Sequence, residues 1–390
     1  MLLTDRKRDL ETYFLSTFDN YKQFAVGVRS GVEKMFAAVT LALGEPPPSH
    51  TPRADLDLSD NVMAYIGMDQ HNAFMTVDRT GSFDTLSGIA SKHYPGTIIS
   101  QGDALPSPDL RTVATFFTHL YQGPATFVHH ARDSVTDILN TDGFHQGCVA
   151  GTLGYALATF PFLGNVLQQD AQVLWFLLVD NTCLVGPLVN TWAMYDRLRI
   201  VLEGLHLHLN PRECVLWVPQ WSYLPTPPPI LNSLRAQYPL SPLTYHPQGF
   251  PTLGLPLGTP EFSKAFLTTV SNKIASTLPP ISSIPDGRIF LQIMRSCVNL
   301  RPHFYLRNLP PSLTDVFAKS CDDALMSTVA AYLAFPIDWR DQPPYIRAVA
   351  QIRNPPKQGG LGIPATHSLI HSSFLAGFSI TLSWIGFSSL

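Results

Sequence analysis

Two short apolar runs that each reach an aspartate constrain the fold of this chain more than any other feature. The first run, NVMAYIGMD, ends at Asp69 and is bounded by polar residues, which is typical of a buried strand. In the second, VLWFLLVDNTCLVGP, two apolar stretches flank the polar residues Asp180 to Thr182, as in a β-hairpin. Because each aspartate follows an apolar run, we expect both to project from the edge of a buried sheet.

The rest of the chain reads mainly as helices and proline-rich connections. Apolar residues at helical spacing predict helices over 11–24, 32–43, 108–121, 147–160 and 188–205. The segment HLHLNPRECVLWVP alternates like a strand and contains a turn at Asn210-Pro211. We predict a proline-rich loop over 219–251, and helices broken by Pro-Pro pairs from about Pro260 onward.

Composition bounds the class of protein. With 390 residues, of which 45% are hydrophobic and 14% charged, the chain can bury a core and form two or three packed units. The five cysteines form no CxxC pair, so neither a disulfide framework nor a zinc site is indicated. Together with a charged N-terminus that lacks the apolar core of a secretory signal, this predicts an intracellular protein of the cytoplasm or nucleus.

The net charge of −3 and pI near 6.5 are poor for holding a phosphate backbone, since non-specific affinity comes from Lys and Arg. Any role on nucleic acid must therefore depend on local patches. Between Arg288 and Lys357 we count nine Lys and Arg against five Asp, a local excess of four positive charges.

The two aspartates have the chemistry that phosphoryl transfer requires. Transfer onto a primer 3′-hydroxyl uses two divalent metal ions, ~3.5–4 Å apart, held by carboxylates on adjacent rigid strands. Asp69 and Asp180 are placed as such ligands would be, and Mg²⁺ or Mn²⁺ prefers oxygen donors of this kind. A lone aspartate at a strand end is more often a cap or a turn former, so neither residue is specific by itself.

Ordered blocks over nearly the whole chain add specificity. In this order and spacing, the chain resembles the reverse transcriptases of non-LTR retrotransposons. Regions outside the palm blocks, YKQFAVGVRSGVEKMFAAV upstream and LRPHFYLRNLPP and PPKQGGLGIPATHS downstream, are similar to the end of the fingers and to the thumb. The blocks similar to palm motifs are GMDQHNAFMTVDR (67–79), GFHQGCVAGTLGYALA (143–158), LLVDNTCLVGP (177–187), LEGLHLHLNPRECVLW (202–217) and TLGLPLG (252–258).

This resemblance implies an α+β fold, the right-hand polymerase palm, in which helices back a small antiparallel sheet. It implies a fingers remnant over 1–45, the palm over 60–258, and a helical thumb and following region over 260–390.

The resemblance also implies site residues. Asp69 and Asp180 match metal ligands, and Asn181 stands at the neighbouring catalytic position. Phe74 matches the aromatic residue that gates the sugar 2′-position, and Gln146-Gly147 matches the turn that opens a helix against nucleotide and template. The implied partners are an RNA template, a DNA primer and dNTPs, and the implied cofactor is Mg²⁺ or Mn²⁺.

Several positions depart from the family pattern. Asn181 replaces the second aspartate, Leu178 the tyrosine and Glu213 a lysine, and no block before Tyr21 resembles the early fingers motifs. Because this reaction depends on electrostatic stabilisation and a basic clamp, we expect impaired or absent catalysis. Two functions stay open: an RNA-directed DNA polymerase by lineage, or a non-catalytic retroelement remnant that binds nucleic acid or protein.

The C-terminal tail HSSFLAGFSITLSWIGFSSL is close to the ~20 residues that span a bilayer. Its Ser and Thr content and its missing basic flank argue against a span. We expect a packed helix and no membrane association.

Overall fold

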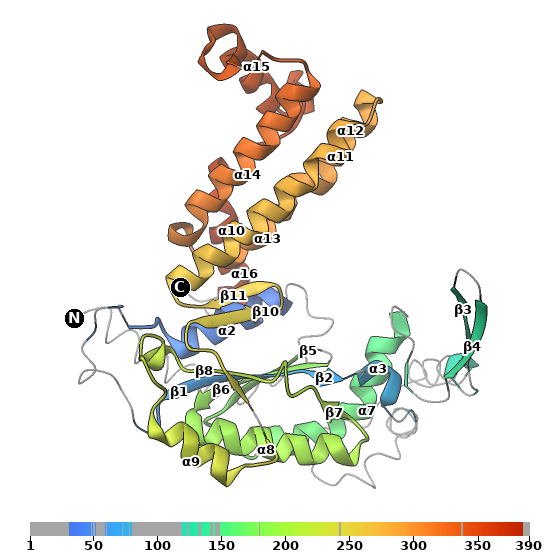
Figure 1. Cartoon of the computed structure of the whole chain (residues 1–390), viewed down its shortest axis with the longest axis vertical. Coiled ribbons are helices and arrows are strands. Elements are labelled where there is room, and N and C mark those ends of the chain that lie inside the picture. Colours follow the sequence, from blue (N-terminus) through green and yellow to red (C-terminus); the bar gives the residue numbers. More distant parts are fainter. Residues whose placement is uncertain are drawn as a thin grey trace. The chain divides into compact units, whose positions relative to one another are not determined.

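The structure is a computed structural model of the chain, in which two compact units can be described separately. One unit comprises 1–31 and 41–247, and the other comprises 32–40 and 248–390. Together they confirm the predicted combination of a small sheet with many helices (Figure 1). The structure describes residues 31–47, 49, 51, 59, 61–71, 73–77, 79, 119–121, 123, 125–131, 134–140, 143–144, 149–178, 180–241, 243–336 and 338–384.

A five-stranded sheet organises the first unit, in the order β5-β6-β1-β8-β9. The predicted hairpin is present, because β5 and β6 pair antiparallel and Leu178 faces Asn181 across its turn. The sheet is not wholly antiparallel as expected, since β9 pairs parallel with β8. Its strands are β1 (Met63–Met68), β5 (Leu174–Leu178), β6 (Asn181–Pro187), β8 (Val215–Trp217) and β9 (Thr244–Tyr245).

Two helices, α7 (Val149–Leu167) and α8 (Leu188–Gly204), pack together, and α8 also packs on β1 and β6 (Figure 1). The helix α8 begins directly after β6, and its Trp192, Tyr195 and Leu198 are at most 1% exposed. These side chains join apolar residues of β1, β6 and β8 in one core cluster. Burial of this core, at ~25 cal/mol per Å² of apolar surface, is what stabilises the sheet.

The segment 219–251 is more ordered than the predicted loop. It contains a helix, α9, that begins at Pro229, because the missing N–H of proline costs nothing in the first helical turn. Leu231 and Leu234 of α9 are buried in the core of the first unit. The other elements of this unit are β2 (Gln70–His71), α3 (Ala73–Thr76), β3 (Ala125–Ala131), β4 (Ser134–Asn140), β7 (His208–Leu209), η2 (Pro219–Trp221) and α9 (Pro229–Gln237).

In the second unit, prolines start helices, and the predicted view that Pro-Pro pairs break them is only half of their role. Pro260, Pro311 and Pro343 each occupy the first turn of a helix. The elements are β10 (Gly249–Thr252), β11 (Leu255–Gly258), α10 (Pro260–Ser276), α11 (Leu278–Ser282), α12 (Gly287–Ile293), η3 (Met294–Val298), α13 (Arg301–Asn308), α14 (Pro311–Tyr332), η4 (Trp339–Asp341), α15 (Pro343–Arg353), η5 (Pro356–Gln358), η6 (His367–Leu369) and α16 (Ile370–Trp384).

A buried aspartate on α14 ties the C-terminal helices together. Asp322 is 9% exposed and accepts hydrogen bonds from the N–H groups of Thr366 (2.8 Å) and His367 (2.9 Å). Arg353 of α15 donates to the same carboxylate at 3.1 Å. Because a buried charge is stable only when it is paired and hydrogen-bonded, this carboxylate fixes α15 and η6 against α14.

The predicted domain limits differ from the observed units in two places. Helix α2 (Gly31–Leu43) confirms the second helix of the predicted fingers remnant, yet its residues 32–40 belong to the second unit. The hairpin of β10 and β11 also belongs to that unit, although we assigned it to the palm. The predicted helices over 11–24 and most of 108–121 lie outside the described residues. No helix in the described ranges is long and apolar enough to cross a membrane.

Candidate active site

The sheet register brings Asp69 and Asp180 to one edge of the sheet. Met68, the last residue of β1, pairs with Thr182 of β6, and Asp69 follows it directly. Asp180 lies in the two-residue turn between β5 and β6, immediately before Asn181. Since paired residues of antiparallel strands have Cα atoms ~4.5–5.5 Å apart, the two aspartates are neighbours across the strand ends.

Negative charge accumulates at this edge. Partial burial, followed by the nearby carboxylates of Glu213 and Asp180, raises the pKa of Asp69 to about 6. A hydrogen bond between Asp69 and Glu213 raises this pKa further, whereas a hydrogen bond with Asn210 lowers it. At neutral pH, Asp69 is therefore ionised only against the repulsion of two other acids.

Asn181 partly compensates for this charge. Its Nδ2 donates a hydrogen bond to Oδ1 of Asp180 at 3.2 Å. A second aspartate at this position would replace that attraction with repulsion in the absence of a cation.

The acid Glu213 reaches Asp69 because residues 211–213 form a turn and not the strand we predicted. The N–H of Arg212 donates to Oδ1 of Asn210 at 3.3 Å, and the N–H of Glu213 donates to the carbonyl of Asn210 at 3.0 Å. Asn followed by Pro favours such a turn, because the Asn side chain bonds to the backbone two residues on. The N–H of Asn210 also donates to the carbonyl of Asp69 at 2.9 Å.

The remaining predicted site residues are described only in part. Phe74 lies in α3, a short helix after β2, and its side chain lies outside the described atoms. Gln146 and Gly147 lie outside the described residues, and the described part of the following helix begins at Val149. Their predicted roles at nucleotide and template therefore stay predictions.

The segment that leads toward α7 is anchored by a buried arginine, which we did not predict. Arg79 is 6% exposed and donates from Nε to the carbonyl of Gly143 and from Nη1 to the carbonyl of Tyr121 at 3.0 Å. The N–H of Gly143 in turn donates to the carbonyl of Val77 at 2.9 Å. These contacts hold residue 143 against the end of the segment that follows Asp69.

A second unpredicted contact joins the strand end to α7. The hydroxyl of Tyr155 donates to Oε1 of Gln70 at 2.5 Å, and both side chains are at most 3% exposed. Burial raises the pKa of Tyr155, and so do the charges of Asp180 and Asp69. A tyrosine inside an apolar helical stretch is most simply interpreted as core, so the sequence offered no signal for this contact.

The donor set fits a hard divalent cation. Two carboxylates, with the amide of Asn181 beside them, supply oxygen ligands at one place, and Mg²⁺ is commonly held by one or two protein carboxylates while water and phosphate complete its shell. A cation would also offset the repulsion that raises the pKa of Asp69. Within the described part of the chain, no group of three or more His, Cys, Asp or Glu residues is arranged to hold a metal ion.

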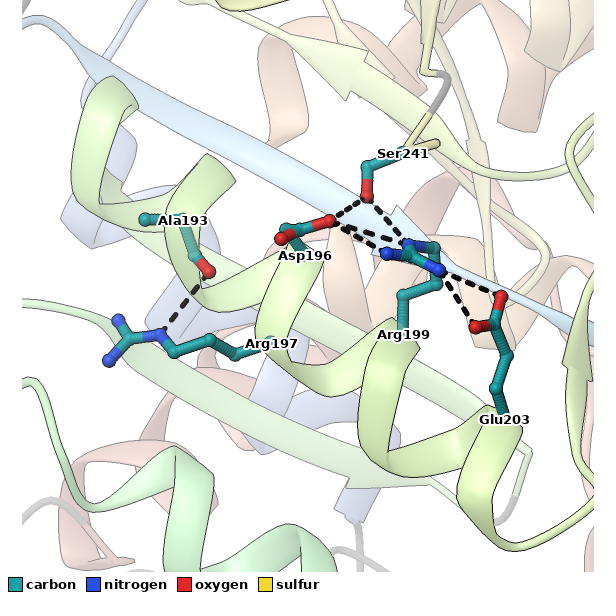
Figure 2. A network of polar contacts seen from close by, with 6 residues as sticks. All are labelled: Ala193, Asp196, Arg197, Arg199, Glu203 and Ser241. Carbon is teal, nitrogen blue, oxygen red and sulfur yellow. Dashed lines mark hydrogen bonds and ion pairs between the residues drawn. The ribbon is translucent and has the colours of Figure 1, made fainter. Parts of the chain in front are cut away.

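Another charged network in the first unit has a structural explanation. Arg199 of α8 is 9% exposed and is bonded to Glu203 (2.8 Å), Asp196 (3.1 Å) and Ser241 (2.9 Å) (Figure 2). Ser241 also donates to Asp196 at 2.5 Å. The network fixes the segment before β9 against α8, and the guanidinium is committed to these internal partners.

Comparison with known proteins adds the following findings. No family model matches the chain, and no curated protein matches it by sequence. Solved telomerase chains are similar to it. Apo telomerase from Candida tropicalis is 11% identical over 99% of this chain and 59% of that chain, with a TM-score of 0.39.

Telomerase from Candida tropicalis in complex with a TWJ fragment of telomeric RNA is 11% identical over 98% of this chain and 54% of that chain, with a TM-score of 0.40. The corresponding complex from Candida albicans is 13% identical over 98% of this chain and 58% of that chain, with a TM-score of 0.38. This chain thus spans little more than half the length of the telomerase chains. Every TM-score lies below 0.5, so a polymerase palm is proposed below from the register and residues of this chain alone.

Proposed function

We propose that this chain is the palm and thumb of a reverse transcriptase of the non-LTR retrotransposon type, an RNA-directed DNA polymerase by lineage. One observation carries the proposal: Asp69 and Asp180 lie side by side at the ends of neighbouring strands in a sheet that helices cover. This is the placement that carboxylates need to hold metal ions for phosphoryl transfer. The implied partners are an RNA template, a DNA primer and dNTPs.

Each site residue has a proposed role. Asp69 and Asp180 hold Mg²⁺ or Mn²⁺, and the side-chain oxygen of Asn181 is a neutral neighbour. When bound, such ions supply Lewis acidity to phosphoryl transfer. Phe74 limits the space at the sugar 2′-position, and Gln146 and Gly147 lie against nucleotide and template.

We propose that catalysis is impaired in this chain. Electrostatic stabilisation dominates phosphoryl transfer, and Asn181 removes one anionic ligand. Glu213 adds an acid beside Asp69, where the family resemblance implies a base that would neutralise or protonate pyrophosphate. Both changes act on charge at the reacting centre, and their effects on rate are therefore not independent.

A primer-extension assay tests this function. The purified chain is given a poly-rA template, an oligo-dT primer and dTTP with Mg²⁺ or Mn²⁺, and we expect extension at background level. Asp180→Ala is the site variant, and Asp170→Ala is a matched control, because Asp170 accepts from Asn190 (2.8 Å) in the same unit away from the site. Robust extension that Asp180→Ala abolishes and Asp170→Ala spares would contradict the impairment and support full activity.

The second candidate function is a non-catalytic binding module. The acids around Asp69 favour it, because they disfavour an anionic nucleotide. In the second unit, Lys319, Arg340 and Arg353 are paired with aspartates, which reduces the positive charge available to phosphates. Fluorescence anisotropy with an RNA–DNA hybrid separates the two candidates: binding without Mn²⁺-dependent extension, unchanged by Asp180→Ala, supports the binding module.

A further inference from the structure

The peptide that follows Asp69 is held from two sides. On one side, Gln70 pairs with Leu209 of β7, and the N–H of Asn210 donates to the carbonyl of Asp69 at 2.9 Å. On the other side, Oε1 of Gln70 accepts from the hydroxyl of Tyr155 on α7 at 2.5 Å. The main chain at Asp69 is therefore fixed relative to both β7 and α7.

The side chain of Gln70 faces the helices, away from where substrate would bind. Side chains of a strand alternate between faces, and Ala64, Ile66 and Met68 of β1 all belong to the core cluster. Gln70 continues this series, whereas Asp69 falls on the opposite face. Because Gln70 is 3% exposed and Tyr155 is 0% exposed, neither is placed to touch a substrate.

Stability does not explain why this pair is polar. The Nε2 of Gln70 is buried and has no hydrogen-bond partner among the described residues. A buried donor without a partner costs ~1–3 kcal/mol, whereas two apolar side chains of similar shape would avoid this cost. A polar pair kept at such a cost, one residue from Asp69, is better explained by a role in the site.

We propose that Gln70 and Tyr155 are a positioning pair for the carboxylates of the candidate metal site. The hydrogen bond from Tyr155 to Gln70 fixes the strand end to α7, and so holds Asp69 beside the hairpin turn that carries Asp180. This inference depends on the proposed function, since it assigns the pair to the same metal site. Side chains that orient metal ligands in this way typically change metal affinity ~10–100-fold when they are removed.

The experiment measures Mn²⁺ affinity by electron paramagnetic resonance titration of the full chain, together with the free energy of unfolding. Asp69→Asn first establishes whether Mn²⁺ binds at the proposed site. Tyr155→Phe should weaken Mn²⁺ binding about tenfold. Tyr245→Phe is the matched control, because its hydroxyl donates to the carbonyl of Trp221 at 3.3 Å elsewhere in the unit, and it should leave Mn²⁺ affinity unchanged.

A double variant separates positioning from simple packing. In Gln70→Leu combined with Tyr155→Phe, both partners are apolar, so we expect the free energy of unfolding to return toward that of the unmodified chain while Mn²⁺ affinity stays low. Recovery of Mn²⁺ affinity along with stability would show that the pair is only structural. Unchanged affinity in Tyr155→Phe would also overturn the inference and leave the metal site standing. If the unmodified chain has no Mn²⁺ binding that Asp69→Asn removes, the proposed metal site itself is wrong.

Discussion

At the scale of single residues, Asn181 decides the charge of the candidate site. Asn181→Asp removes the hydrogen bond to Asp180 (3.2 Å) and adds a third acid beside Asp69. Without divalent metal, we expect the free energy of unfolding to fall by about 1 kcal/mol, and we expect Mn²⁺ to restore it. Primer extension should stay at background level, because Glu213 still stands beside Asp69 and residues that act together recover little when one is repaired.

Asn190→Asp is the matched control for this variant. Its Nδ2 donates to Oδ2 of Asp170 at 2.8 Å, so the same substitution again places an acid beside an aspartate. Thermal denaturation should show a comparable loss of stability with no recovery in Mn²⁺. Copying by Asn181→Asp at a rate well above that of the unmodified chain would show that one missing carboxylate was the whole defect.

The pKa of Asp69 predicts a pH dependence of stability. This pKa rises from 3.8 to about 6 on folding, so between these values the folded chain keeps a proton that the unfolded chain has lost. Stability from this group is therefore full below about pH 4 and decreases as pH rises through 6. Asp69→Asn should be more stable than the unmodified chain at pH 7, by on the order of 1 kcal/mol after solvent screening, and the difference should vanish near pH 4.

Urea denaturation between pH 4 and pH 7.5, without divalent ions, checks this expectation. Asp338→Asn, at an exposed position of the second unit, is the control and should leave the pH profile unchanged. A variant at Asp69 whose stability follows the same pH profile as the unmodified chain would mean that Asp69 does not feel Glu213 and Asp180.

At the scale of elements, the packing of α7 depends on a glycine. A Cβ added to Gly154 would lie 2.4 Å from the ring of Phe144, which is fully buried and packs edge-on against Tyr121. Although alanine favours a helix by ~1 kcal/mol over glycine, we expect Gly154→Ala to destabilise the chain by roughly 1–3 kcal/mol through overpacking. Gly204→Ala on α8 meets no atom within 4 Å and should be neutral or stabilising in the same thermal melts. Stabilisation by both substitutions would mean that Phe144 does not pack on α7.

At the scale of the whole molecule, the division into two units predicts two separable unfolding transitions. Ile66 of β1 is fully buried in the core of the first unit, and Asp322 ties together helices of the second. Ile66→Ala should lower the midpoint of one transition by a loss of about 2–5 kcal/mol. Asp322→Ala should lower the other, because it leaves Arg353 and two N–H groups without their acceptor at a cost of ~3–5 kcal/mol. Differential scanning calorimetry checks this, and a common shift of a single transition by both variants would show that the units unfold as one.

The sequence alone determined the local elements and the two aspartates. Alternation and turn residues predicted β1, the β5–β6 hairpin and α8, because side-chain period and turn chemistry act within a few residues. The same local rules failed where a partner distant in sequence decided the outcome. Leu231 and Leu234 gain burial only against the core, so α9 did not stand out from its proline-rich surroundings.

Only the tertiary structure decided which of these elements meet. Period 2 assigns a residue to a face of a strand but does not choose the neighbouring strand, so the order β5-β6-β1-β8-β9 and the parallel pairing of β9 were not predictable. The same holds for Glu213 beside Asp69 and for Tyr155 bonded to Gln70, since both contacts join residues far apart in the chain. Chain composition and spacing therefore identified which carboxylates matter, whereas strand pairing and helix packing determined the charges and hydrogen bonds that surround them.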